Sequence, residues 1–200
     1  MAASLTPASA RCSWRREWRT LLPLAGILVA VAVHYGDLRR PGLATGDEAL
    51  TALRTRGLVE EGHWWTPFYN GAADVHKPPL YYWLAAICGR LTGELDERAV
   101  RLPSAASFLG LIAIVHALGR RIYDPWTGLA AAAAVALHPL LLTQSRVGML
   151  DTTMTLFTMA AALFLLKAAE DSRRLHGWGL CVGLALLAKG EAATPVLPAS

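Results

Sequence analysis

Residues 103–119 read PSAASFLGLIAIVHALG, an apolar stretch with no charged side chain that ends against Arg120 and Arg121. A helix of about 20 residues crosses the hydrocarbon core of a bilayer, and about 17 to 25 are tolerated. The stretch therefore predicts a membrane-spanning helix, and the paired arginines indicate the side of the membrane on which it ends.

Four further apolar blocks have the same character, and they cover 21–35, 125–143, 149–169 and 177–199. The first of them is short unless Trp18 and its neighbours extend it. The chain of 200 residues is 54% hydrophobic and 17% charged, and its mean hydropathy is +0.36. This composition is typical of membrane proteins, so we expect an all-α membrane protein built as a multi-span helical bundle.

A sixth apolar stretch, 80–89, is too short to span a bilayer and is followed by Arg90. We interpret it as a helix along the membrane surface, following two prolines. The arginines at 11–19, 120–121 and 173–174 then share one side, which the positive-inside rule makes cytoplasmic. The expected parts are a basic cytoplasmic tail (1–20), a first transmembrane helix (21–36), an extracytoplasmic loop with juxtamembrane helices (37–102) and four further transmembrane helices (103–200).

The first apolar block allows a second interpretation, since basic residues precede it and Ala30-Val31-Ala32 imitates a signal-peptidase site. The long loop stays outside in either case. The net charge of +4 does not indicate a nucleic-acid partner, because the arginines flank apolar blocks. A disulfide framework is not expected either, because no two of Cys12, Cys88 and Cys181 share an oxidising compartment.

Within the long loop, Thr45 and Glu48 form a T-x-x-E capping box that predicts the start of a helix. The helix is expected to run to about Glu61, with one face made of Leu50, Leu53 and Gly57.

Asp47 and Glu48 in the first turn of this helix have two interpretations. Acidic residues at a helix N-terminus stabilise the helix by opposing its dipole. Asp47 also lies near the expected membrane surface, where a carboxylate can take a proton from an incoming hydroxyl. Both roles are compatible.

Lys77 precedes the aromatic segment Leu80-Tyr-Tyr-Trp83. A lysine at headgroup level can hold an anionic group, either bulk lipid or one specific phosphate. The alternative is an interfacial lysine whose ammonium reaches water.

Three further ionisable residues lie at or within apolar blocks, namely Arg146, Asp151 and Lys189. Such residues are costly at membrane depth and are functional candidates with partners. A plain ion pair between Arg146 and Asp151 is the structural alternative, and Lys189 requires a cavity or a counter-ion. The six histidines show no metal spacing, and no Gly-rich phosphate loop or nucleophile elbow is present.

Together, and in this order, the motifs resemble the family 39 glycosyltransferases, which include bacterial aminoarabinose transferases and protein O-mannosyltransferases. The resemblance covers about 45–190. The motifs are Gly46-Asp-Glu48, Gly62-His-Trp-Trp-Thr-Pro-Phe-Tyr-Asn-Gly71, Lys77-Pro-Pro-Leu-Tyr-Tyr-Trp83, Val100-Arg-Leu-Pro-Ser-Ala105, Leu150-Asp151 and Lys189-Gly190.

The resemblance implies a GT-C fold and a polyprenyl-phosphate sugar donor, with a lipid or protein acceptor. It implies a multi-pass protein of the bacterial inner membrane whose active face is extracytoplasmic. Asp47 matches the family's acidic residue that activates the acceptor or organises the site, and Lys77 matches the lysine near the donor phosphate. Asp151 would orient the acceptor or a divalent metal ion, the need for which stays open. Substrate contacts are also expected from Glu48, Arg146 and Lys189.

The chain departs from the family pattern at His76, Thr51 and Glu191, where relatives often carry Asp, an aromatic residue and Pro. Family members are also longer, so we expect this chain to be an N-terminal portion. A non-catalytic membrane module derived from such an enzyme is the main alternative. A transporter is a weaker one, because only Lys189 fits a charge near the bilayer midplane.

Overall fold

The structure is a computed structural model that describes residues 7–38, 46–69, 72–73 and 77–190. It is helical apart from a hairpin of two very short strands, in which Phe68 pairs with Ala73. The elements are α1 (Pro7–His34), α2 (Gly46–Glu60), β1 (Phe68–Tyr69), β2 (Ala72–Ala73), α3 (Leu80–Thr92), α4 (Glu97–Ile122), α5 (Pro125–Ala136), α6 (Pro139–Gln144), α7 (Leu150–Ala168), η1 (Ser172–Arg174) and α8 (Leu175–Lys189).

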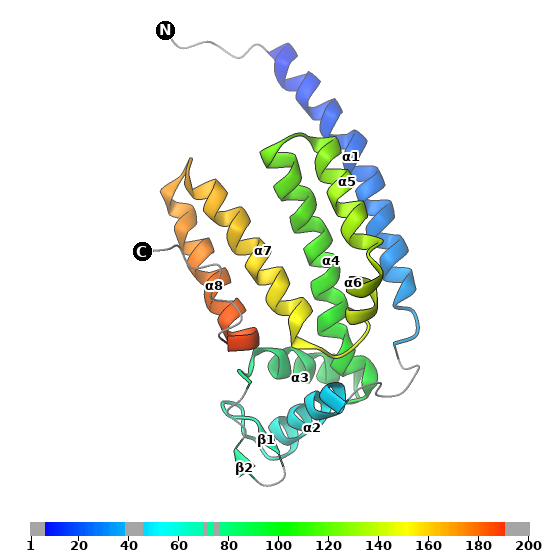
Figure 1. The fold of residues 1–200 in the computed structure, drawn as a ribbon, viewed down its shortest axis with the longest axis vertical. Helices are drawn as coiled ribbons and strands as arrows, with labels where there is room; N and C mark the ends of the chain where they lie inside the picture. The colour runs from blue at the N-terminus through cyan, green and yellow to red at the C-terminus, as the bar shows by residue number, and fades with distance from the viewer. Residues whose placement is uncertain (1–6, 39–45, 70–71, 74–76, 191–200) are drawn as a thin grey trace.

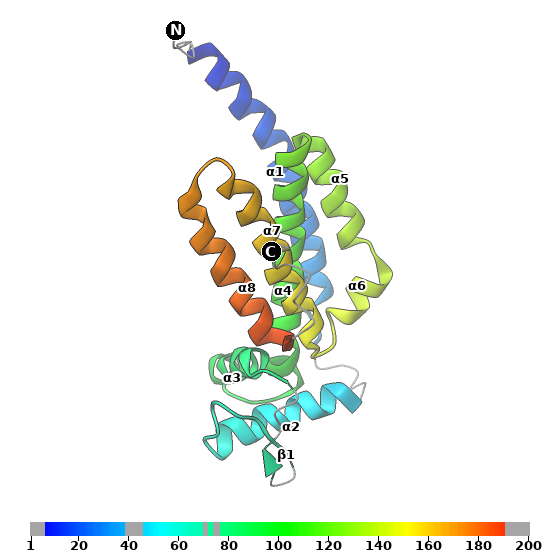
Figure 2. The ribbon, with the colours of Figure 1, turned by 60° about the vertical axis from the view of Figure 1, so that its left-hand side comes forward.

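Helices α1, α4, α5, α7 and α8 form a bundle, and α2 and α3 lie across one end of it (Figures 1 and 2). Among the described residues, α4 and α7 are long and apolar enough to cross a membrane. Helix α5 and the part of α1 from Arg19 to His34 are shorter apolar helices. The predicted all-α multi-span architecture is therefore confirmed, whereas the cytoplasmic and extracytoplasmic parts stay a prediction.

The helix expected at 80–89 is α3, and it does not run beside the spanning helices. It packs against α2 and α4 at the end of the bundle. The sequence interpretation stopped the helix at Arg90, but it continues to Thr92 and ends at Gly93, whose φ of +84° favours glycine. The guanidinium of Arg90 lies over the ring of Trp64, 5.0 Å from its centroid.

The predicted span 125–143 is wrong as one continuous helix, because the chain breaks between α5 and α6. Pro139 cannot donate a backbone hydrogen bond and disfavours a helical conformation at the preceding residue. His138 accordingly has φ −70° and ψ 115° and caps α6, its Nδ1 accepting from the amide of Leu141. Helix α8 stops at Lys189, and the part of the last predicted span beyond residue 190 lies outside the described residues.

Small residues bring α5 close to α4. A Cβ atom at Gly128 would lie 2.5 Å from the carbonyl oxygen of His116, and one at Gly119 would lie 2.7 Å from the Cα of Gly128. Buried Ala132 and Ala136 continue this face of α5 at helical spacing. Close approach through small residues is what holds helices together where the surrounding solvent is itself apolar.

The buried face of α2 is the predicted one only in part. Gly57 is buried as expected, but Leu53 is 47% exposed, and the side chains of Glu48, Thr51 and Thr55 are buried together with Leu58. The hydroxyls of Thr51 and Thr55 are satisfied within the helix, since each donates to the carbonyl oxygen four residues earlier. The predicted capping box involves Thr45, which lies outside the described residues.

Candidate active site

A cavity of about 80 Å³ lies where α2, α7 and α8 meet the segment before α3. It contains four of the six residues selected from the sequence, although these are separated by up to 142 positions along the chain. The residues that line it are Asp47, Thr51, Arg54, Lys77, Met149, Leu150, Asp151 and Lys189.

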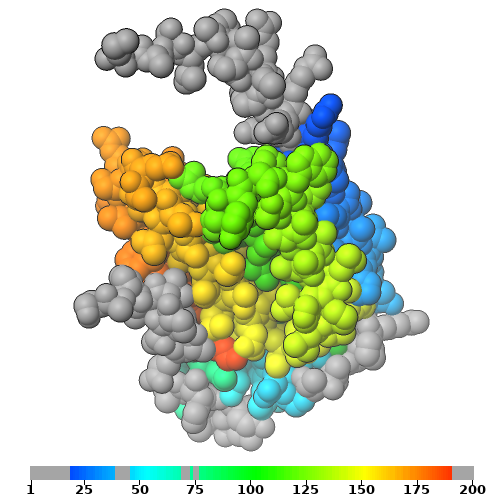
Figure 3. Space-filling view, turned by 45° about the horizontal axis from the view of Figure 1, so that its top comes forward, coloured from blue at the N-terminus to red at the C-terminus, as the bar shows by residue number. Residues whose placement is uncertain are grey.

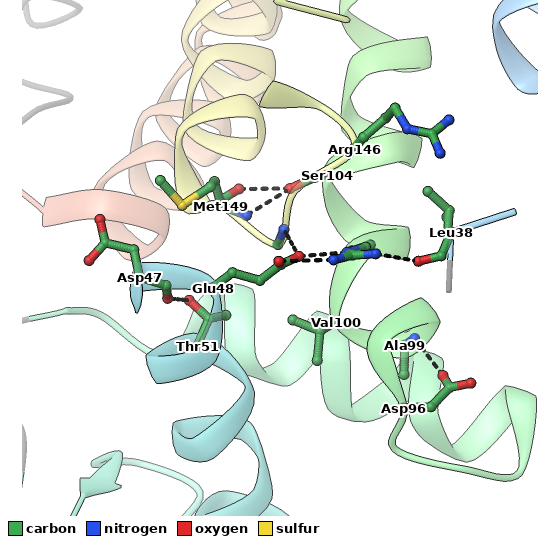
Figure 4. Close-up of polar contacts among 12 residues, drawn as sticks. Leu38, Asp47, Glu48, Thr51, Asp96, Ala99, Val100, Ser104, Arg146 and Met149 are labelled. Carbon is green, nitrogen blue, oxygen red and sulfur yellow. Dashed lines mark hydrogen bonds and ion pairs between the residues drawn. The ribbon is translucent and has the colours of Figure 1, made fainter. Parts of the chain in front are cut away.

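Asp47 lies in the first turn of α2, and its carboxylate is exposed. It points toward α8, away from the side chain of its neighbour Glu48 (Figure 4). Consecutive residues on an α-helix project about 100° apart, so two adjacent carboxylates can serve different environments. Asp47 faces the cavity, and Glu48 enters the interior.

Glu48 is fully buried and holds Arg101 of α4 through two bonds, Nε to Oε1 at 2.6 Å and Nη2 to Oε2 at 3.0 Å (Figure 4). Its Oε1 also accepts the backbone amide of Gly148 at 2.9 Å, and Arg101 donates to the carbonyl oxygen of Leu38 at 2.6 Å. Charge-assisted bonds of this kind are strong and directional. The sequence interpretation assigned Glu48 to substrate, but this enclosed position favours a structural role.

Gly148 allows this network to close. A Cβ atom there would come within 2.6 Å of Val100 Cγ1 and 3.4 Å of Glu48 Cγ. The segment before α7 can therefore approach α4 and α2 only with glycine at this position.

A second polar chain joins α3, α4 and the start of α7. The Tyr81 hydroxyl donates to the carbonyl oxygen of Val100 and lies 2.8 Å from Ser104 Oγ, which in turn donates to the carbonyl oxygen of Met149. Burial strongly raises the pKa of Tyr81, so the phenol stays protonated and keeps its donor. Because Met149 directly precedes α7, this chain fixes the helix start that carries Asp151.

Asp151 forms an ion pair with Lys189 across α7 and α8. The expectation that Lys189 needs a counter-ion is thus confirmed. The alternative pairing of Asp151 with Arg146 is wrong in this structure. Both paired side chains keep some exposure, 46% for Asp151 and 28% for Lys189, so the pair remains accessible from the cavity.

Arg146 lies outside the cavity. Its guanidinium donates to the carbonyl oxygens of His34 and Asp37, at the end of α1, and points away from Asp47 (Figure 4). Unpaired carbonyls at a helix C-terminus are suitable acceptors for an arginine. The predicted contact between Arg146 and a departing phosphate is therefore not favoured by its position.

Arg54 is a cavity residue that the sequence interpretation missed. Its Nη1 donates to the Tyr82 hydroxyl at 3.4 Å, and its side chain is only partly exposed. Its spacing from Asp47 could have identified it, because positions 47, 51 and 54 follow the i, i+4, i+7 intervals of one helix face. The role of Arg101 was also missed. The sequence identifies this residue only as part of the Val100–Ala105 motif and does not indicate that it pairs with Glu48.

The described part of the chain offers few ligands for a divalent metal ion. No group of three or more His, Cys, Asp or Glu side chains there could hold a metal ion. Asp47 and Asp151 offer two carboxylates on one cavity, and Asp151 is already neutralised by Lys189. His76 and Glu191, where the chain departs from the family pattern, lie outside the described residues.

The chain is similar to curated bacterial transferases. It is 28% identical over 192 residues to the undecaprenyl phosphate-alpha-4-amino-4-deoxy-L-arabinose arabinosyl transferase 2 of Sodalis glossinidius. The alignment covers 90% of this chain and 34% of that protein. It is 30% identical over 157 residues to the corresponding transferase of Erwinia tasmaniensis, covering 75% of this chain and 28% of the relative.

Two solved structures of ArnT from Cupriavidus metallidurans have the same fold. The apo structure superposes with a TM-score of 0.74 at 24% identity, over 92% of this chain and 34% of that one. The structure bound to undecaprenyl phosphate superposes with a TM-score of 0.70 at 26% identity, over 88% of this chain and 33% of that one. The GT-C helical fold expected from the sequence is thereby confirmed.

The chain spans about a third of the length of these relatives. Residues 76–200, more than half of the chain, match the family model described as dolichyl-phosphate-mannose-protein mannosyltransferase. The chain belongs to this family of membrane glycosyltransferases.

Proposed function

We propose that the chain forms the acceptor-activating and phosphate-binding part of a glycosyltransferase that takes its sugar from a polyprenyl-phosphate donor. The observation that carries the proposal is the composition of the cavity. An exposed carboxylate, Asp47, shares a small space with cations from three separate segments, Arg54, Lys77 and Lys189.

Lys77 and Arg54 are assigned to the donor phosphate. Both side chains line the cavity together with Asp47, and the third cation there, Lys189, is paired with Asp151. Lysine binds phosphate as a point charge and arginine as a planar fork. Two such groups would hold the departing phosphate and stabilise the charge that develops on it.

The proposed reaction is a displacement at the anomeric carbon. An acceptor hydroxyl oxygen forms a new bond to that carbon while the bond from the carbon to the phosphate oxygen breaks. The electron pair of the broken bond stays on the phosphate, next to Lys77 and Arg54, and the hydroxyl proton passes to the Asp47 carboxylate. Asp151, held by Lys189, would orient the acceptor.

The names of the relatives suggest the first donor to test. Both relatives described above are named as transferases of 4-amino-4-deoxy-L-arabinose from undecaprenyl phosphate. We propose the same donor for this chain, with a lipid or a protein as the acceptor. We also propose that the protein resides in the bacterial inner membrane and that the cavity opens on the extracytoplasmic side, opposite the arginine clusters.

The proposal is tested by sugar transfer in membranes that contain the protein. The donor carries a radiolabelled aminoarabinose, and the label is followed separately into the lipid and the protein fractions. Removing a general base typically lowers the rate about 100-fold or more, so Asp47→Asn should lose transfer to that extent. Lys77→Gln should weaken use of the donor.

The matched control is Glu60→Gln, which removes one carboxylate from an exposed position on the same helix. It should transfer sugar at the parent rate. Transfer by Asp47→Asn at the parent rate would remove Asp47 from the mechanism.

A further inference from the structure

A second polar cavity lies at the end of the bundle opposite the candidate active site. It has a volume of about 340 Å³ and is formed between the ends of α4 and α7, near the start of α5. In Figure 3 the end of α4 and the start of α5, in green, lie beside the end of α7 and the start of α8, in orange. The residues that line it are Ala117, Arg120, Arg121, Pro125, Leu163 and Lys167.

The charge of this cavity is strongly positive. Arg121 is neutralised by Glu170, with 2.5 Å between Nη2 and Oε1, and its guanidinium lowers the pKa of that carboxyl. Within the described residues, neither Arg120 nor Lys167 has an acidic partner; Lys167 lies 5.9 Å from the centroid of the Phe164 ring. The nearby Asp124 is occupied in capping α5.

The cavity lies at the depth of lipid headgroups. Helix α7 has 19 residues, so it is about 28 Å long, close to the thickness of the hydrocarbon core. Asp151 is in its first turn and Lys167 in its last. Tyr123 and Trp126, beside the cavity, are 75% and 55% exposed, as expected for aromatic residues at a membrane interface.

We infer that this cavity binds the phosphate of an anionic phospholipid, with Arg120 and Lys167 as its two cationic ligands. Basic cavities between membrane helices bind such headgroups. Ala117 and Leu163 line the same cavity and provide an apolar wall for the glycerol and the first carbons of the acyl chains. The site is separate from the proposed sugar transfer and requires none of the residues assigned to it.

The test is native mass spectrometry of the purified protein in a neutral detergent with equal amounts of phosphatidylglycerol and phosphatidylcholine. The parent protein should retain one phosphatidylglycerol with an affinity about tenfold or more above that for phosphatidylcholine. The double variant Arg120→Gln/Lys167→Gln should show less than about a twofold preference. Far-UV circular dichroism and elution volume establish that the variants are folded.

The matched control is Arg173→Gln/Arg174→Gln, which removes two positive charges at the same end of the bundle but outside the cavity. It should keep the parent preference. If it loses the preference as fully as the cavity variant, or if the parent shows none, the inference is wrong. A single Lys167→Gln variant gives the same answer should the double variant fail to fold.

Inorganic phosphate and glycerol phosphate distinguish the lipid from a free anion. Neither should displace phosphatidylglycerol at millimolar concentration, because the acyl chains contribute to binding. Displacement by inorganic phosphate would assign the cavity to a soluble anion and overturn the inference.

Discussion

Asp47 and Glu48 are adjacent carboxylates with opposite surroundings, and this difference organises the candidate site. Asp47 is exposed on the cavity, while Glu48 is buried against Arg101 and Gly148. The buried pair holds α2 against α4 and the segment before α7. It thereby sets the position from which Asp47 faces Asp151 and Lys189.

The first prediction separates these two roles. Glu48→Gln leaves Arg101 buried without its counter-ion, which should lower the free energy of unfolding by about 3 kcal/mol or more. Asp47→Asn should leave it within about 0.5 kcal/mol of the parent, because the side chain is at the surface. Thermal unfolding in detergent measures both, and equal losses for the two variants would contradict the assignment.

The second prediction concerns Arg146, which the sequence interpretation placed with the phosphate. Arg146→Gln removes charged donors from two carbonyls at the end of α1, so it should cost about 1–2 kcal/mol of stability. Sugar transfer per folded molecule should stay within about twofold of the parent. A large loss of transfer at unchanged stability would instead support the substrate contact that the sequence predicts for Arg146.

At the residue scale, the sequence was informative about charged residues at or near the expected membrane surface. Asp151 and Lys189 were identified because a charge at or within an apolar block is costly, and Asp47 and Lys77 were identified from their places in the loop; all four line the cavity. The partners could not be derived, because pairing depends on packing between distant segments. Lys189 pairs with Asp151, Glu48 pairs with Arg101, and Arg146 binds backbone carbonyls.

The elements that cross the end of the bundle are attached by polar contacts and by a hydrophobic cluster. Helix α2 is held through Glu48, and α3 is held through the Tyr81 hydroxyl to α4. A hydrophobic cluster joins α2, through Leu58, to α3, through Tyr82 and Ala86, and Trp83 Nε1 donates to the carbonyl oxygen of Trp64 at 2.6 Å. These contacts hold α2, and with it Asp47, in a fixed position at the end of the bundle.

The third prediction tests the close contact of α4 with α5. A Cβ atom at Gly128 would lie 2.5 Å from a carbonyl oxygen of α4, so Gly128→Ala should force the helices apart and cost about 1–3 kcal/mol. Gly183→Ala in α8 is the matched control, because a Cβ there meets no atom within 4 Å. It should be neutral or stabilising by at most about 1 kcal/mol.

Helix positions followed well from hydropathy, because each apolar block in the described part of the chain contains a helix. The break between α5 and α6 did not follow, although Pro139 was visible, since prolines also occur in continuous membrane helices. The buried face of α2 was predicted only in part, for a different reason. It buries the polar side chain of Glu48, whose partner Arg101 lies on α4 and cannot be identified from hydropathy.

The whole molecule has two chemically different ends. The candidate active site lies where α7 begins, and the basic cavity lies where α7 ends. Arg120, Arg121, Arg173 and Arg174 all belong to the second end, as the positive-inside rule predicts for one side of a membrane. Asp47 and Asp151 share the first end because α3 lies across the bundle.

Cysteine labelling tests this arrangement most directly. Single cysteines replace Asp47, Asp151 or Arg173 in a protein whose Cys12, Cys88 and Cys181 are changed to Ser, and a membrane-impermeant maleimide is applied to sealed vesicles of known orientation. Positions 47 and 151 should react from the same, extracytoplasmic side, and position 173 only from the other. Reaction of positions 47 and 151 from opposite sides would contradict the account.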